Sequence, residues 1–193
     1  MKRIKYLFIC LFLSACIFGT SQNSKFYSFL PQSGKVLSSS YTNSVGIGRV
    51  LLPKYMDKPQ IVTQSTDSAE VILSEYNRWI EAPSVLCQRS VIDNLSAALP
   101  RAQIQAQQFG TQKFDIRISI EVIKMDGILG DKANLQAWYT ITKQDGQVLL
   151  RKKFLQNLSV GKTYDDLVQG YSILWHNLSY EMAKSLLANV NPS

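Results

Sequence analysis

The sequence contains few of the side chains that metal binding and nucleophilic catalysis require. Its 193 residues include one histidine and three cysteines. This excludes multi-histidine and His-Cys zinc sites and leaves His176 as the only base that a catalytic triad could use. It has no Cys-x-x-Cys, His-Glu-x-x-His, Gly-x-Ser-x-Gly or phosphate-loop motif. We therefore expect no cofactor, no metal site and no catalytic residue, with His176 at a solvated edge of a helix.

Charged side chains are also scarce, at 18% of the chain against 46% apolar side chains. This composition excludes a disordered tail and a coiled coil, and it favours one globular domain. The formal net charge of +7 includes Lys2, Arg3 and Lys5 at the start of the chain. Because the remaining surplus is small and spread out, a dedicated nucleic-acid-binding surface is not expected.

Long hydrophobic runs are missing as well. The uncharged run Tyr6–Phe18 follows the basic start of the chain. It is shorter than the roughly 20 apolar residues that a membrane-spanning helix needs. A basic start followed by a short apolar run is typical of a secretory signal peptide. We assign residues 1–15 to this leader.

A cysteine, Cys16, directly follows the leader. Leu13-Ser14-Ala15-Cys16 resembles the lipobox of bacterial lipoproteins, which implies cleavage between Ala15 and Cys16, attachment of diacylglycerol to the Cys16 thiol and a further acyl chain, such as palmitate, on the freed amine. An ordinary signal peptide that happens to contain a cysteine is the alternative. Cys10 is a poorer lipidation site because bulky residues precede it.

Two or more acyl chains anchor a protein firmly to a membrane. Ile17, not aspartate, follows Cys16, and in the sorting rule known for enterobacterial lipoproteins this implies the outer membrane, with the outer face of the inner membrane as the alternative. We expect residues 16–24 to be the lipidated N-terminus and a flexible tether, and residues 25–193 to form one domain. Cys87 is then its only thiol, expected to be buried and inert.

The domain shows both strand and helix patterns. Apolar and polar residues alternate over Lys113–Lys124, and a hairpin turn falls at Gln144–Gly146. One helix is expected after Pro83, with Ser84 as its cap, and a longer one after a Thr163 cap. Expected strands cover 25–30, 45–52, 60–64, 70–74, 113–124, 135–142 and 147–154. We predict an α+β fold with a mostly antiparallel sheet and two main helices on one face.

Trp138 is the aromatic residue most suited to a partner. It shares strand parity with Gln136 and Thr140, opposite the apolar face of Leu135 and Tyr139. We therefore predict that Trp138 is exposed and available as a partner contact.

Two segments resemble a known family. Val45-Gly-Ile-Gly-Arg-Val-Leu-Leu-Pro-Lys-Tyr-Met-Asp-Lys-Pro-Gln-Ile-Val-Thr63 is similar to the signature of the ABC-type transport auxiliary lipoproteins, and Arg78-Trp79-Ile80-Glu81 is similar to their Arg-Trp-x-Glu segment. Lys58 and Gln64 depart from that pattern, which more often has arginine. We interpret the matching residues as structural, with an Arg78–Glu81 salt bridge bracing the turn: Pro53, Tyr55, Asp57, Pro59, Gln60, Arg78, Trp79 and Glu81.

The resemblance extends to the lipoprotein of paraquat-inducible (Pqi) systems. It implies an accessory subunit, not an enzyme, that works beside an ABC transporter and a PqiB-like MCE-domain protein in lipid transport between membranes and so supports envelope integrity. It also implies a homo-oligomer. The alternatives are a pilotin-like or envelope-structural lipoprotein of another machine and, less favoured, a periplasmic hydrolase.

Overall fold

The computed structural model describes residues 22–107 and 113–190. Ala15, Cys16 and the predicted leader lie outside these residues. Within them the chain forms, in order, β1 (Lys25–Tyr27), β2 (Ser44–Ile47), β3 (Gln60–Gln64), β4 (Val71–Trp79), α2 (Pro83–Ala98), β5 (Gln103–Ala106), β6 (Ile116–Ile128), β7 (Lys132–Lys143), β8 (Val148–Ser159) and α3 (Tyr164–Asn189).

The larger sheet has the strand order β5-β2-β6-β7-β8. β6, β7 and β8 are long antiparallel neighbours, which confirms the predicted meander. The turn between β7 and β8 contains Gly146 at a φ of 91°, a backbone conformation that glycine adopts without steric cost. β2 pairs in parallel with both β5 and β6, so the sheet is mixed and its long strands are antiparallel.

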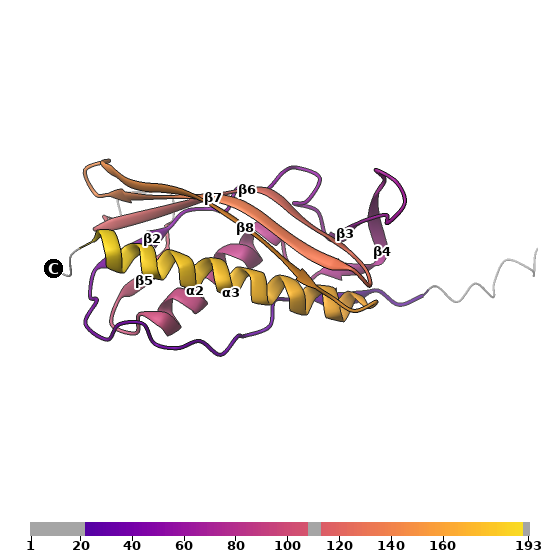
Figure 1. The fold of residues 1–193 in the computed structure, drawn as a ribbon, viewed down its shortest axis with the longest axis horizontal. Coiled ribbons are helices and arrows are strands. Elements are labelled where there is room, and N and C mark those ends of the chain that lie inside the picture. The colour runs from indigo at the N-terminus through magenta and orange to yellow at the C-terminus, as the bar shows by residue number, and fades with distance from the viewer. Residues whose placement is uncertain (1–21, 108–112, 191–193) are drawn as a thin grey trace, which may run out of the picture.

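The smaller sheet has the order β1-β4-β3. β3 and β4 form an antiparallel hairpin with an irregularity in its register. β1 lies parallel to the end of β4, with Lys25 opposite Asn77 and Tyr27 opposite Trp79. Figure 1 shows the hairpin projecting at the end of the molecule from which the N-terminal segment leaves.

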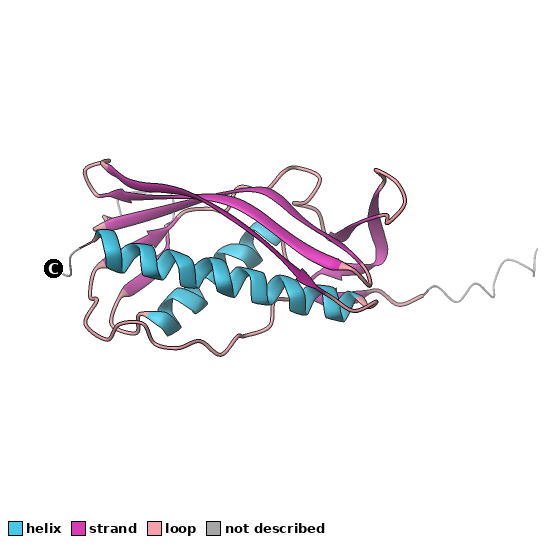
Figure 2. Ribbon diagram, viewed as in Figure 1, coloured by secondary structure: helices cyan, strands magenta, loops and turns pink. Residues whose placement is uncertain are grey.

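Both helices cover the same face of the larger sheet (Figure 2). α3 begins with a capping box, because Thr163 Oγ1 accepts a hydrogen bond from Asp166 N at 3.1 Å and Asp166 Oδ2 accepts one from Thr163 N at 3.1 Å. Its apolar stripe is fully buried, and each such side chain stabilises the fold by about 1.5–3 kcal/mol. The α+β class and the placement of the helices are confirmed.

Several predicted boundaries were wrong. β1 ends at Tyr27 and β2 ends at Ile47, and β5 was not predicted at all. β6 does not end at Lys124, as predicted, but continues to Ile128. Asp126 is buried there, at 1% exposure, and accepts a hydrogen bond from Asn134 Nδ2 at 3.0 Å. Asp126-Gly127, a residue pair that is common in turns, therefore lies within a long paired strand.

Candidate functional site

The Pro53–Pro59 segment is a tight turn that is fastened at both ends. Pro53 O accepts hydrogen bonds from Met56 N at 2.8 Å and from Asp57 N at 3.2 Å, while Pro59 O accepts one from Trp79 N at 2.7 Å. Met56 is 1% exposed within the core. The turn thus connects the end of β2 to the small sheet and places the Asp57 carboxylate at the start of α2.

Asp57 caps α2 from outside the helix. The N-cap residue is Ala82, which has no side-chain hydrogen bond to offer. Asp57 Oδ1 accepts from Ser84 N at 3.1 Å and Oδ2 accepts from Ser84 Oγ at 3.2 Å. A carboxylate at a helix N-terminus satisfies an unpaired N–H and interacts favourably with the helix dipole. The prediction that Ser84 is the cap was wrong. Ala82, directly before Pro83, has no side-chain group that could cap the helix, and this is the sequence signal that the cap comes from another segment.

The second motif segment packs beneath this turn. Trp79 is 4% exposed, and its ring lies 5.3 Å from Phe29 and 6.3 Å from Tyr171, measured between centroids. The expected Arg78–Glu81 bridge was wrong, since Glu81 pairs with Arg89 on α2 at 2.9 Å. This pair connects the segment directly to the helix that follows it.

The remaining motif residues lie nearer the surface. Gln60 begins β3, in register with Arg78 on β4. Tyr55 is 44% exposed. Partial burial and then the nearby Asp126 raise the pKa of the Tyr55 phenol, so it stays protonated and can donate a hydrogen bond at neutral pH.

Trp138 lies on the face of the larger sheet that the helices leave open. Its side chain is half-buried, and the Arg151 guanidinium carbon lies 4.8 Å from the ring centroid, a cation–π geometry. Beside it is a hollow of about 130 Å³, which is smaller than a typical ligand pocket. Arg49 and Glu121 also line this hollow.

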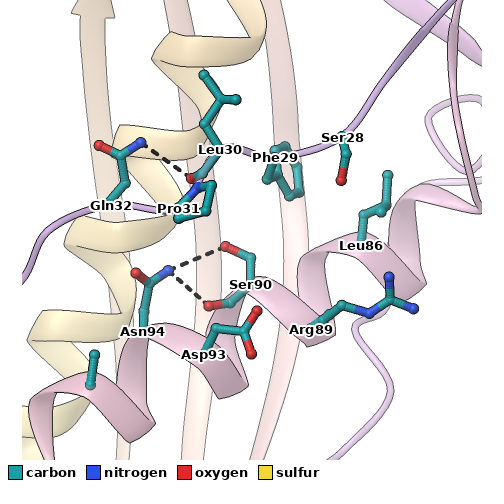
Figure 3. A pocket seen from close by; sticks show the side chains of 11 residues that line it. Ser28, Phe29, Leu30, Pro31, Gln32, Leu86, Arg89, Ser90, Asp93 and Asn94 are labelled. Carbon is teal, nitrogen blue, oxygen red and sulfur yellow. Dashed lines mark hydrogen bonds between the residues drawn. The ribbon is translucent and has the colours of Figure 1, made fainter.

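A separate cleft of about 260 Å³ lies where residues 28–32 cross α2 (Figure 3). This cleft and the hollow beside Trp138 are both smaller than the roughly 300–1,000 Å³ of typical small-molecule sites. In the cleft, Asn94 Nδ2 donates to Ser90 O at 2.8 Å and Gln32 Nε2 donates to Leu30 O at 3.2 Å. Its amide groups are thus already engaged within the chain.

His176 and Cys87 take part in packing. His176 Nδ1 lies 2.9 Å from Asn94 Oδ1 and its ring stacks on Tyr180, with 6.0 Å between centroids. Burial lowers the pKa of His176. Cys87 is fully buried in α2, and burial raises the pKa of its thiol well above the ordinary range. A protonated, inaccessible thiol is a poor nucleophile.

The part of the chain that the structure describes shows neither a metal-binding cluster nor a membrane-spanning helix. Over residues 22–107 and 113–190, no group of three or more histidine, cysteine or acidic side chains is arranged to hold a metal ion. Over the same part of the chain, no helix has the length and hydropathy to cross a membrane.

Comparison with known families gives one match that spans most of the domain. Residues 27–183 match the model of a family described as the ABC-type transport auxiliary lipoprotein component. This range contains the Pro53–Pro59 turn, the Arg78–Glu81 segment and most of α3. The resemblance drawn from the sequence motifs is therefore confirmed.

Curated relatives and solved structures agree with this match. The chain is 21% identical to the intermembrane transport lipoprotein PqiC of Escherichia coli (strain K12) over 187 residues, which cover 96% of this chain and 98% of the relative, and PqiC of Shigella flexneri gives the same values. The crystal structure of an uncharacterized protein superposes with a TM-score of 0.71 at 18% identity, covering 86% of this chain and 99% of that one. A protein from Xanthomonas campestris superposes with a TM-score of 0.69 at 12% identity, covering 86% and 96%. These two structures support the fold.

Proposed function

This chain belongs to the family of ABC-type transport auxiliary lipoprotein components, and from this premise we propose that it is the lipid-anchored accessory subunit of a Pqi-like intermembrane transport system. The observation that carries the proposal is its similarity to PqiC along nearly the whole length of both proteins. In this role the chain catalyses no reaction. It holds a transport protein at the membrane and so supports envelope integrity.

The anchor that we propose is an acylated Cys16. Residues 1–15 are removed as the leader, residues 16–24 form the tether, and residues 25–193 form the domain. Residues 22–24 leave β1 as exposed coil, in keeping with a tether. Acyl chains at Cys16 would then keep the domain on the periplasmic face of the outer membrane, because Ile17 is not the aspartate that retains lipoproteins in the inner membrane.

The partner that we propose is an MCE-domain protein similar to PqiB, and we propose that several copies of this chain assemble around it. Trp138 is the contact that we assign to a partner. Its support is its position on the open face of the sheet, where tryptophan and arginine lie together. These two residue types are enriched among the side chains that dominate binding energy at protein interfaces.

A pair of cysteine substitutions tests the anchor. Cys16→Ala should release the chain from the membrane fraction, abolish incorporation of labelled palmitate and leave a folded domain, because only this thiol is acylated. Cys10→Ala is the matched control and should stay in the outer membrane fraction. Full membrane association and full function of Cys16→Ala would overturn the proposal.

A further inference from the structure

The tip of the β3–β4 hairpin, residues 65–75, combines exposed apolar residues with carboxylates. Val71, Ile72 and Leu73 are 40%, 41% and 46% exposed. Since successive side chains of a strand point to opposite faces, exposure of three in a row leaves both faces of the hairpin uncovered. The other large exposed side chains of the tip end in carboxylates: Asp67, Glu70 and Glu75.

One edge of this hairpin is also open. β1 pairs with β4 only from Asn77 to Trp79, so among the described residues no strand lies beside Val71–Leu73 on the side away from β3. The sequence from Gln60 to Asn77 contains no lysine, arginine or histidine. A contiguous apolar patch that carries charge of a single sign indicates a binding surface for a basic partner.

The open face of β6, β7 and β8 has the opposite charge. We define the basic face by Arg49, Arg151 and Lys153, which lie around Trp138, together with Arg117, which lies opposite Thr142 farther along the sheet. Register places Lys153 directly opposite Trp138, and Arg151 opposite Thr140. Among the outward-pointing residues of these three strands that the structure describes, Glu121 is the exposed carboxylate, whereas Asp126 is buried and paired with Lys124. Leu51 and Leu155, which are 60% and 67% exposed, add apolar area.

The arginines of the basic face are only loosely paired. The Arg151–Glu121 and Arg49–Asp57 pairs are 3.6 and 3.7 Å long, beyond the roughly 2.7–2.9 Å of a charge-assisted hydrogen bond. Arg117 Nε is buried and donates no hydrogen bond. The loosely paired guanidinium groups of Arg49 and Arg151 can still donate hydrogen bonds to an incoming carboxylate. The hollow of about 130 Å³ between Arg49, Trp138 and Arg151 leaves room for an inserted side chain.

The acidic tip and the basic face complement each other in both charge and apolar area. The tip projects from one end of the molecule (Figure 1), while the basic face lies along the sheet. A bilayer is a poor occupant for the tip, because membrane-binding surfaces are rich in lysine and arginine and this tip has neither. Two different surfaces that fit each other on one chain define a heterologous interface, which repeats from copy to copy.

We propose that copies of this chain associate head to tail, with the acidic tip of one copy seated on the basic face of the next and a tip carboxylate beside Arg151. This inference deepens the proposed function, because it names the surfaces through which the copies assemble. The repeated contact closes into a ring if the rotation between copies allows it.

Charge reversal on each surface tests the contact. The face variant carries Arg151→Glu with Lys153→Glu, and the tip variant carries Glu70→Lys with Glu75→Lys. Full-length processed protein is purified in non-ionic detergent and its protein mass is measured by sedimentation. The wild type should contain more than two copies and should dissociate as salt is raised. Each variant alone should be a single copy.

Mixing gives the decisive result. Equal amounts of the two variants should form larger assemblies again, because the unchanged tip of the face variant fits the unchanged face of the tip variant, and the lysines of the reversed tip fit the glutamates of the reversed face. A chain with all four substitutions should also form larger assemblies, through the second of these contacts alone. The matched control, Arg101→Glu with Lys184→Glu, changes exposed cations outside both surfaces and should keep the wild-type mass.

Several results would overturn the head-to-tail contact: a single-copy wild type, variants that keep the wild-type mass, or a mixture that stays single-copy. Pairing in the mixture also shows that both variants are folded. Every variant keeps Cys16 and no transport protein is present, so failure here leaves the anchor and the MCE partner untouched. Release of Cys16→Ala from the membrane would likewise leave the contact intact.

Discussion

The two faces of the larger sheet are built from the same strands but have different compositions. On the covered face, Ile118, Leu135 and Tyr139 are at most 1% exposed and pack against the helices. On the open face, Trp138, Arg151 and Lys153 reach solvent. Alternation within a strand thus separates stability from binding: one set of residues holds the fold, and the other can bind partners without affecting the core.

The largest expected effect comes from truncating neighbouring positions on opposite faces of β7. Leu135→Ala leaves a cavity in the core and should lower the free energy of unfolding by about 2–5 kcal/mol. Trp138→Ala should lower it by less than about 1 kcal/mol, since it removes one partly exposed contact with Arg151. Urea denaturation measures both. A larger loss for Trp138→Ala would break the contrast between the faces.

A smaller loss is expected where the Pro53–Pro59 turn supports the helices. Asp57→Ala removes both hydrogen bonds to Ser84 and should lower the free energy of unfolding by about 1–2 kcal/mol, as for other helix caps. Asp67→Ala, at the exposed hairpin tip, is the control and should change it by less than about 0.5 kcal/mol. Equal effects of the two substitutions would contradict the capping role.

Removing a single buried hydroxyl should lower the free energy of unfolding by about 1 kcal/mol. Tyr139 OH and Ser185 Oγ are 2.8 Å apart between the sheet and α3. Tyr139→Phe should lower the free energy of unfolding by about 0.5–1.5 kcal/mol, because the bond is lost and Ser185 stays buried. Combining Tyr139→Phe with Ser185→Ala should cost less than the two separate losses added together. Strict additivity would show that the two groups do not interact.

The smallest expected effect is a pH dependence of the free energy of unfolding that comes from His176 on α3. Burial lowers the pKa of His176 below its ordinary value of 6.5, so the folded state binds the proton less readily than the unfolded state does. The contribution of neutral His176 to the free energy of unfolding is therefore complete above pH 6.5. It is lost as pH falls through the lower pKa of the folded state. His176→Gln should flatten this slope in urea denaturation between neutral and mildly acidic pH. An unchanged slope in the variant would assign the dependence to other groups.

Much of the fold could be predicted because its signals are local. The alternation of β6, the turn at Gly146 and the Thr163 cap each lie within a few residues of sequence, and all three were found. β5 was missed because Gln103–Ala106 is short and mostly polar. The parallel pairing of β1 with β4 joins segments about fifty residues apart, and no local pattern encodes such a contact.

The site was predicted less completely for the same reason. Strand parity was enough to place Trp138 on the open face of the sheet, where it is half-buried and not fully exposed. The Asp57 cap joins positions that are 27 residues apart, so sequence reasoning assigned the cap to Ser84 instead. Val71–Leu73 reads as a core strand by composition, but it lies in a small sheet at the end of the molecule and is exposed. Apolar composition predicts a strand and does not reveal whether anything covers it.

The central claim is that this domain is an anchored adaptor whose open surfaces engage a transport machine. The most direct test is to purify the lipidated chain from membranes and to identify the proteins that accompany it by mass spectrometry. The account predicts an MCE-domain protein in near-constant proportion with the wild type and with Cys10→Ala, and its loss with Cys16→Ala. An acylated wild type that brings down no MCE-domain protein would contradict the account.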